Sequence, residues 1–155
     1  MEKIKWTYNI SVMEIVYRPI GIIHTPFKEH APIQPLYSEA RGVVEVFDEY
    51  KEGLKDLETF SHIILVYHFH LSKGYRLEAK PYLDDEPKGI FAIRSPNRPN
   101  GIGISTVALE RIEGAKLHVL HVDMLDGTPL LDIKPYVPEF DIRDASSGWL
   151  NGKIK

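Results

Sequence analysis

The segment 102–125 reads IGISTVALERIEGAKLHVLHVDML, and it decides the fold class. Two runs rich in β-branched and other apolar residues, IGISTVALERI and KLHVLHVDML, are separated only by a short stretch that contains a glycine. This composition and punctuation are typical of β-strands. Further runs of the same kind lie on both sides of the segment, at 15–25, 42–47, 62–70, 89–94 and 129–137.

Only one segment, DEYKEGLKDLETF (48–60), favours a helix. Its apolar residues Tyr50, Leu54 and Leu57 fall on one helical face, while Gly53 makes the helix short and weak. Strands therefore outnumber helices by about six or seven to one. The sequence predicts a mainly β fold: a compact antiparallel β-barrel of about six or seven strands, with one short helix and long loops.

The size of the chain indicates one folding unit. With 155 residues, 43% of them hydrophobic, the chain is long enough for one substantial core but short for two. We expect a single barrel domain over residues 15–155 and an N-terminal extension over residues 1–14, where little periodicity is found. Deletion of residues 1–12 is predicted to leave ligand affinity unchanged.

Composition also limits where the protein works. The absence of cysteine excludes disulfides, thiolate metal ligands and a cysteine nucleophile, and it is compatible with the reducing cytoplasm. The apolar run at 63–67 is too short to cross a bilayer, and polar residues interrupt the N-terminal stretch that a signal peptide would need. We expect a cytoplasmic protein that does not associate with membranes.

The formal net charge of −3 argues against binding nucleic acid mainly by bulk positive charge. Charge is uneven, however, because residues 73–98 carry six basic side chains and four acidic ones. Such a patch is usually an ordinary solvated surface, but it also permits a polyanionic ligand.

The stretch GIFAIRSPNRPNGIGIS (89–105) has unusual chemistry for a turn. Pro96 and Pro99 push the residues before them towards extended backbone. This predicts a stiff connection that holds Arg98 outward and Arg94 at a strand end, where a guanidinium can engage a carboxylate or phosphate. The simpler alternative is a polar surface hairpin. The GIGIS portion lacks the third glycine of a dinucleotide fingerprint and is followed by strand-forming residues, so a Rossmann site is not expected.

Other motifs allow several interpretations. In HIILVYHFH (62–70), period two places His62, His68 and His70 on one face, and His68 with His70 could bind a metal if a third ligand such as His24 or His121 came close. Asp126-Gly127 is a hairpin turn signal, and the rigid Thr128-Pro129 that follows suits recognition of an adenine edge. Gln34, in the proline-flanked APIQP, offers both a hydrogen-bond donor and an acceptor and could line a second side of a binding site. The simpler alternative is that this segment is an ordinary loop.

Taken in order and spacing, five stretches resemble the TsaA-like (TrmO-like) family of tRNA methyltransferases. The resemblance runs from Tyr17 to Pro138, and its most specific part is the arginine-rich loop followed by DGTPLLDIKPY. The stretches are IGIIHTPFK, PIQP, FSHIILVYHFH, GIFAIRSPNRPNGIGIS and DMLDGTPLLDIKPYVP.

The resemblance implies a β-barrel that binds S-adenosylmethionine without a Rossmann sheet, forms a homodimer, and methylates N6 of threonylcarbamoyladenosine beside the tRNA anticodon. Where many relatives have arginine and glutamine, this chain has Ile33 and Leu71, so backbone contacts are expected at these two positions. Carried over by position, the cofactor contacts are Pro32, Ile33, Gln34, His70, Leu71, Arg94, Ser105, Asp126, Gly127, Thr128 and Pro129.

For the tRNA, we expect contacts from Arg98, Asn100, Lys134 and Tyr136, because the modified adenosine carries a carboxylate and the anticodon loop presents unstacked bases. On this hypothesis Arg98→Ala lowers tRNA affinity and leaves cofactor affinity little changed. No general base is assigned; His68, His70 and Asp126 are candidates. Two alternatives stay open: a metal-dependent β-barrel enzyme that uses His68 and His70, and a non-catalytic barrel that binds a nucleotide or RNA.

Overall fold

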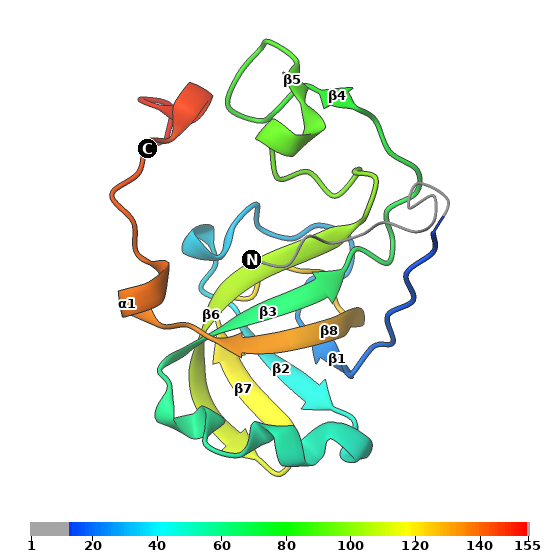
Figure 1. The fold of residues 1–155 in the computed structure, drawn as a ribbon, viewed down its shortest axis with the longest axis vertical. Coiled ribbons are helices and arrows are strands. Elements are labelled where there is room, and N and C mark those ends of the chain that lie inside the picture. Colours follow the sequence, from blue (N-terminus) through cyan, green and yellow to red (C-terminus); the bar gives the residue numbers. More distant parts are fainter. Residues whose placement is uncertain (1–12, 155) are drawn as a thin grey trace, which may run out of the picture.

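A computed structural model describes residues 13–154, and its centre is a closed six-stranded antiparallel barrel (Figure 1). Around the barrel the strand order is β1-β2-β7-β6-β3-β8, so the first and last strands of the chain pair with each other and close the ring. The predicted fold class is therefore confirmed. The barrel strands are β1 (Gly21–His24), β2 (Arg41–Val46), β3 (His62–His68), β6 (Ile102–Glu113), β7 (Lys116–Leu120) and β8 (Thr128–Pro135).

The barrel forms because its strands alternate between inward apolar and outward side chains. In β3, Ile63, Leu65 and Tyr67 are buried while His68 is exposed, as the predicted period of two requires. The other strands contribute the same kind of alternating side chains to one shared core. That core consists mainly of Ile23, Val44, Val46, Val107, Leu117, Val119, Val122, Met124 and Leu130 around the β3 residues.

Several predicted elements differ from the structure in type or length. The segment 48–60 forms two 3₁₀ helices, η3 (Asp48–Leu54) and η4 (Leu57–Thr59), in place of one short α-helix. The first of these helices ends at Leu54, and Asp56, with a left-handed φ of 68°, precedes the second. The strand predicted at 15–25 covers only Gly21–His24, and the residues from Met13 to Pro19 are exposed.

The segment 89–94 was predicted as a strand, but half of it is a short 3₁₀ helix. Only Lys88–Gly89 forms the short strand β5, which pairs with β4 (Glu78–Ala79), and the 3₁₀ helix η5 (Ile90–Ala92) follows. The turn predicted at Asp126-Gly127 exists, with Gly127 at a φ of 80°. It does not close a hairpin, because β7 pairs with β2 and β6 whereas β8 pairs with β1 and β3.

After β8 the chain runs back along the barrel to the segment that contains β4 and β5 (Figure 1). This C-terminal arm contains the one short α-helix among the described residues, α1 (Pro138–Asp141), and the 3₁₀ helix η6 (Gly148–Leu150). Trp149 Nε1 donates a hydrogen bond to the carbonyl of Ala92 (2.8 Å), and Lys88 Nζ lies 5.5 Å from the centroid of the Trp149 ring. The arm is therefore attached to the loop that leads to Arg94.

Candidate functional site

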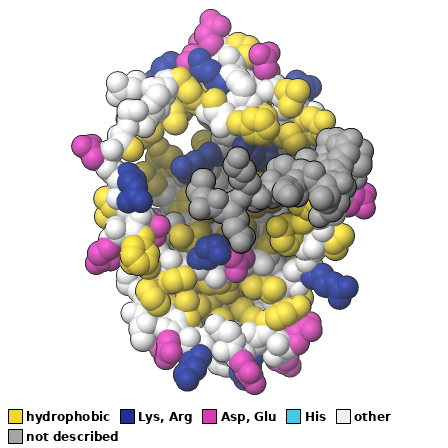
Figure 2. Space-filling model, in the orientation of Figure 1, with side chains coloured by type: hydrophobic (Ala, Val, Ile, Leu, Met, Phe, Trp, Pro, Cys, Tyr) yellow, Lys and Arg dark blue, Asp and Glu magenta, His cyan; other side chains and the backbone are white. Residues whose placement is uncertain are grey.

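One end of the barrel gathers the three loops that carry the predicted cofactor contacts. At this end His68 pairs with Ile102, Ile23 pairs with Thr128, and Arg41 pairs with Leu120. The loops 25–40, 69–101 and 121–127 therefore all emerge on the same side. Figure 2 shows that the molecule is hollowed on one face, with apolar and basic side chains around the hollow.

Gln34 and Arg94 contact each other directly, although 60 positions separate them in the sequence. Arg94 Nη1 donates a hydrogen bond to Gln34 Oε1 at 2.8 Å. The Arg94 side chain is exposed, and its remaining N–H groups can donate to a ligand. Of the two neighbours of Gln34 in the predicted site, Ile33 is exposed and Pro32 is half-buried. The structure thus joins the first loop to the arginine-rich loop.

The outward orientation predicted for Arg98 is wrong. Arg98 is half-buried, and its Nη1 donates to the carbonyls of Ile93 (2.9 Å) and Ser95 (3.2 Å), on either side of Arg94. A guanidinium can bridge carbonyls in this way because its donors are held in a rigid fork. Arg98 therefore braces the loop that presents Arg94. Its contact with tRNA stays a prediction, as does that of the exposed Asn100.

The turn at 125–128 is fixed to the start of the first loop by its own acid. The carboxylate of Asp126 accepts hydrogen bonds from the Thr25 amide (2.9 Å) and from Lys28 Nζ (2.5 Å). The hydrogen bond from Lys28, followed by that from Thr25, lowers the pKa of Asp126. Gly127 N donates to the carbonyl of Ile23 at 2.9 Å. These hydrogen bonds fix the backbone of the turn at the barrel end where the three loops emerge.

His70 lies beside this turn: a methyl group built on Gly127 would be 4.0 Å from His70 Nε2. Burial, and then the neighbouring His68, lower the pKa of His70, so the neutral ring is favoured at pH 7. Leu71 is exposed. Among residues 13–154, no group of three His, Asp or Glu side chains has the geometry to hold a metal ion, so the third ligand that the His68–His70 metal hypothesis needs is not supplied there.

The structure adds Asp123, on the segment that follows β7, as a site residue that the sequence reasoning missed. Ser105, buried on β6, donates a hydrogen bond from Oγ to Asp123 Oδ1 (2.5 Å) and shares another with the Tyr67 hydroxyl (2.8 Å). Burial raises the pKa of Asp123 to about 6, although the Ser105 hydrogen bond and the charge of Arg94 oppose the rise. Burial, and secondarily the charge of Asp123, raise the pKa of Tyr67 as well. These groups connect the barrel interior to the Arg94 side of the site.

Two of the predicted tRNA contacts are not near this end of the barrel. Lys134 pairs with Ile64 near the start of β3, and the Tyr136 amide donates to the carbonyl of His62 at 3.1 Å. From Thr128 to Tyr136 the extended chain covers about 26 Å at roughly 3.3 Å per residue. Lys134 Nζ is also paired with Asp132 Oδ2 at 2.8 Å. Within one chain, Lys134 and Tyr136 therefore do not join the other predicted site residues.

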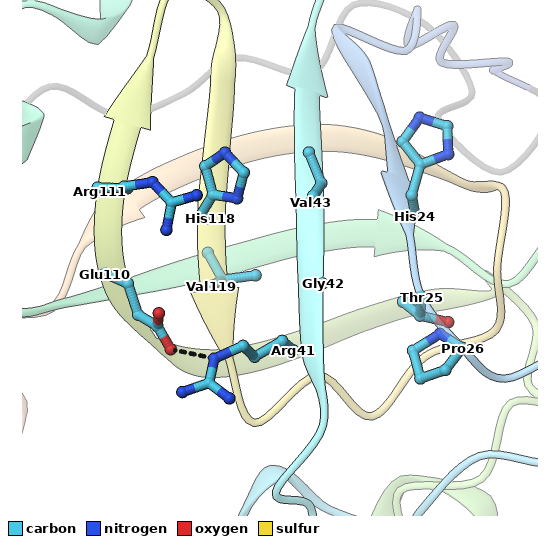
Figure 3. A pocket seen from close by; sticks show the side chains of 10 residues that line it. All are labelled: His24, Thr25, Pro26, Arg41, Gly42, Val43, Glu110, Arg111, His118 and Val119. Carbon is cyan, nitrogen blue, oxygen red and sulfur yellow. Dashed lines mark hydrogen bonds and ion pairs between the residues drawn. The ribbon is translucent and has the colours of Figure 1, made fainter.

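A separate hollow of about 400 Å³ lies on the outer face of the barrel over β1, β2, β7 and β6 (Figure 3). Its basic side chains already have acidic partners: Arg41 pairs with Glu110 (3.0 Å), Arg111 with Glu113 (2.6 Å), and His24 with Glu45 (2.9 Å). None of the predicted cofactor contacts lines it. We therefore place the functional site at the loop end and not in this hollow.

Comparison with known proteins identifies the family of the chain. A family model described as the tRNA-methyltransferase O N-terminal domain matches residues 22–142. A probable S-adenosyl-L-methionine-binding protein of Pyrococcus abyssi is 57% identical over 144 residues, which are 90% of this chain and 78% of that protein. A tRNA (adenine(37)-N6)-methyltransferase of Mus musculus is 37% identical over 82% of this chain and 32% of its own length.

Solved structures match in the same way. A crystal structure of TrmO from Pseudomonas aeruginosa superposes with a TM-score of 0.75 at 40% identity, over 92% of this chain. The chain spans 64% of the length of that solved protein. Because the family model covers well over half of the chain and the Pyrococcus relative is well above 30% identical, the chain belongs to the tRNA-methyltransferase O N-terminal domain family.

Proposed function

We propose that the protein is an S-adenosylmethionine-dependent methyltransferase acting on N6 of threonylcarbamoyladenosine next to the tRNA anticodon. One observation carries the proposal: Gln34, Arg94 and the turn at 126–129 lie on loops at one end of the barrel, with Gln34 and Arg94 in direct contact, and β6, which carries Ser105, begins at that end. Family membership gives this arrangement its chemistry, because relatives are named for binding S-adenosyl-L-methionine and for methylating tRNA adenine.

The chemistry of these residues fits the methyl donor. The exposed guanidinium of Arg94 suits its carboxylate, and the fixed backbone of the turn at 126–129 suits the edge of its adenine. The lowered pKa of His70 keeps that ring uncharged, so it does not repel a sulfonium cation. When bound, S-adenosylmethionine supplies an electrophilic methyl group.

The residues of the chain have mainly a positioning role in methyl transfer. In-line displacement depends on holding the accepting nitrogen about 3 Å from the methyl carbon in a site without water. The brace of Arg98 on the Arg94 loop and the ties of Asp126 to Thr25 and Lys28 supply that rigidity. A proton must also leave N6, and we assign no base for it.

We further propose that the protein acts as a homodimer in the cytoplasm. Two features support dimerisation: large apolar side chains point outward from β6 at Ile102 and Ile104, and Lys134 and Tyr136 could complete a site only across a subunit boundary. Analytical ultracentrifugation checks the state, and Ile104→Glu should shift a dimer towards the monomer. The cysteine-free composition suits a reducing compartment. As a separate finding, none of the helices between residues 13 and 154 has the length and hydropathy of a membrane span.

The decisive experiment is incubation of the protein with methyl-labelled S-adenosylmethionine and total tRNA, followed by nucleoside analysis. Labelled methyl-threonylcarbamoyladenosine is the expected product, and Arg94→Ala should abolish it. Thermal shift separates the alternatives, because a ligand that binds only the folded state raises the melting temperature. Stabilisation by S-adenosylmethionine supports the proposal, whereas a shift with zinc alone would favour the metal-dependent enzyme.

A further inference from the structure

Asp123 is a charged side chain in a place where charge is costly. It lies between the buried residues Val122 and Met124, on the segment that follows β7. Ser105 donates to its Oδ1, and no described residue outside Asp123 itself donates to its Oδ2. The backbone N–H of Asp123 itself also hydrogen-bonds to this carboxylate. With Ser105 as the one other donor among the described residues, the carboxylate keeps acceptor capacity for a ligand.

Arg94 is close enough for its charge to act on Asp123, but the two side chains form no direct ion pair in the described part of the chain. The guanidinium is held by Gln34 Oε1, and the carboxylate is held by the Ser105 hydroxyl. Because each side chain is held by its own partner, neither charge neutralises the other in a direct ion pair. A group with adjacent positive and negative ends can pair with both.

We propose that Asp123 is a binding residue for the methyl donor, with its carboxylate accepting hydrogen bonds from the α-ammonium group while Arg94 receives the α-carboxylate. The inference rests on the proposed function and extends it, because none of the residues assigned above holds the ammonium group. The amino-acid end of the ligand would replace water between Asp123 and Arg94 and pair both charges.

The proposal requires an ionised Asp123 at working pH. Burial raises the pKa of this carboxyl to about 6, so the carboxylate form dominates above pH 7. The groups that act on it are Tyr67 from β3, Ser105 from β6 and Arg94 from the loop, and none of these changes charge between pH 5 and 8. Nδ1–H of His121, two residues before it, donates to a separate partner, the carbonyl of Ser38, at 2.7 Å.

Calorimetric titration of the full chain at pH 8 tests the inference with three ligands. S-adenosylmethionine and S-adenosylhomocysteine both carry the amino-acid end, whereas 5′-methylthioadenosine lacks it. Asp123→Asn should weaken the first two by a similar factor of about 10 to 100, as expected for a lost charge-assisted hydrogen bond, and leave the third within about twofold. Asp132→Asn is the matched control, because Asp132 lies near the other end of the barrel beside Lys134.

Each result decides between the possibilities. Equal affinity of wild type and Asp123→Asn for S-adenosylmethionine overturns the inference, and so does weakening of all three ligands or of S-adenosylmethionine alone. If the wild-type protein binds none of the three ligands, the proposed function fails first.

A second measurement does not depend on the variant folding. In the wild type, affinity for S-adenosylmethionine should fall about tenfold from pH 7.5 to pH 5, while affinity for 5′-methylthioadenosine stays constant. His70→Asn, which removes the titratable ring beside the turn at 126–129, should keep this pH dependence. A profile that is flat for S-adenosylmethionine, or that disappears in His70→Asn, refutes the role of Asp123.

Discussion

The ionised carboxylate of Asp123 lowers the stability of the folded protein, because the side chain is largely buried at the site. The pKa of Asp123 is about 6 in the folded chain, above its ordinary 3.8, because burial disfavours the charged form more than Ser105 and Arg94 favour it. Folding therefore favours the protonated acid. The stability contributed by that preference is present below about pH 4 and is lost as the pH rises through 6.

Asp123→Asn should consequently stabilise the ligand-free protein at high pH. Asparagine keeps an oxygen that can accept from Ser105 but carries no charge, so the free energy of unfolding should rise by about 2–3 kcal/mol at pH 8 and change little at pH 4. Urea denaturation at both pH values measures the difference. Asp144→Asn, at an exposed position on the C-terminal arm, is the control. A gain of equal size at pH 4 and pH 8 would show that charge burial is not its cause.

At the scale of elements, the arginine-rich loop is rigid because its own side chains hold it. Arg98 bridges the carbonyls on both sides of Arg94, and Ser72 Oγ donates to Asn97 Oδ1 (2.5 Å) from the strand-end side. Preordering of this kind reduces the entropy lost when a ligand binds. The brace thus acts on cofactor affinity through Arg94.

Arg98→Ala should weaken S-adenosylmethionine binding about tenfold, because the loss of the two Arg98 hydrogen bonds lets Arg94 leave its position. This expectation is the reverse of the one drawn from sequence alone, which assigned Arg98 to tRNA. Calorimetry measures the affinity of Arg98→Ala for the cofactor, and filter binding measures its affinity for tRNA, so the two expectations can be separated. Arg76→Ala is the control, because Arg76 is an exposed arginine in the same loop, 69–101. If Arg98→Ala lowered only tRNA affinity, the assignment of Arg98 to tRNA binding would be restored.

The C-terminal arm supports the same loop from outside. Trp149→Phe keeps an aromatic ring beside Lys88 but removes the Nε1–H that donates to the Ala92 carbonyl. Hydrogen exchange of the Ile90 and Ile93 amides should then become about fivefold faster, the expected effect of one lost hydrogen bond. Phe140→Leu changes an exposed ring of the same arm and should have no effect. Unchanged exchange in Trp149→Phe would mean that the arm does not stabilise the loop.

For the whole molecule, closure of the barrel depends on a close approach at Gly21. A methyl group added there would collide with the carbonyl oxygen of Glu45 on β2, and that backbone cannot move without loss of β1–β2 pairing. β1 also pairs with β8, so a shift of β1 disturbs the closed ring on both sides.

Gly21→Ala should therefore lower the free energy of unfolding by about 2–4 kcal/mol. Gly53→Ala is the matched control, because nothing lies within 4 Å of the added methyl group and its φ is not positive. It should be neutral or slightly stabilising. Urea unfolding of both variants measures the contrast, and similar stabilities would contradict the proposed steric role of Gly21.

The strands could be predicted because the alternation of apolar and polar residues is visible within each short segment. The site could be predicted only in part. Alternation in 62–68 gives the inward face of β3 directly from the sequence. The role of Asp123 does not follow from such a pattern, since HVDML resembles a continuing strand. β7 ends at Leu120, and His121 takes a φ of 79°, which redirects the chain. Lys134 does not join the other predicted residues within one chain, because nearness in sequence to the turn becomes distance along an extended strand. Its contact with tRNA stays a prediction.

The ring closed by β1 and β8 has a consequence for synthesis of the chain. β1 is made early, yet one of its two partners begins only at Thr128, more than 100 residues later, so the ring cannot close until most of the protein has left the ribosome. Until then the edges of β1 and β3 are unprotected and can pair with other nascent chains. Pairing of β8 therefore closes the barrel and removes the edges that could aggregate. The same step brings the turn at 125–128 to its final position.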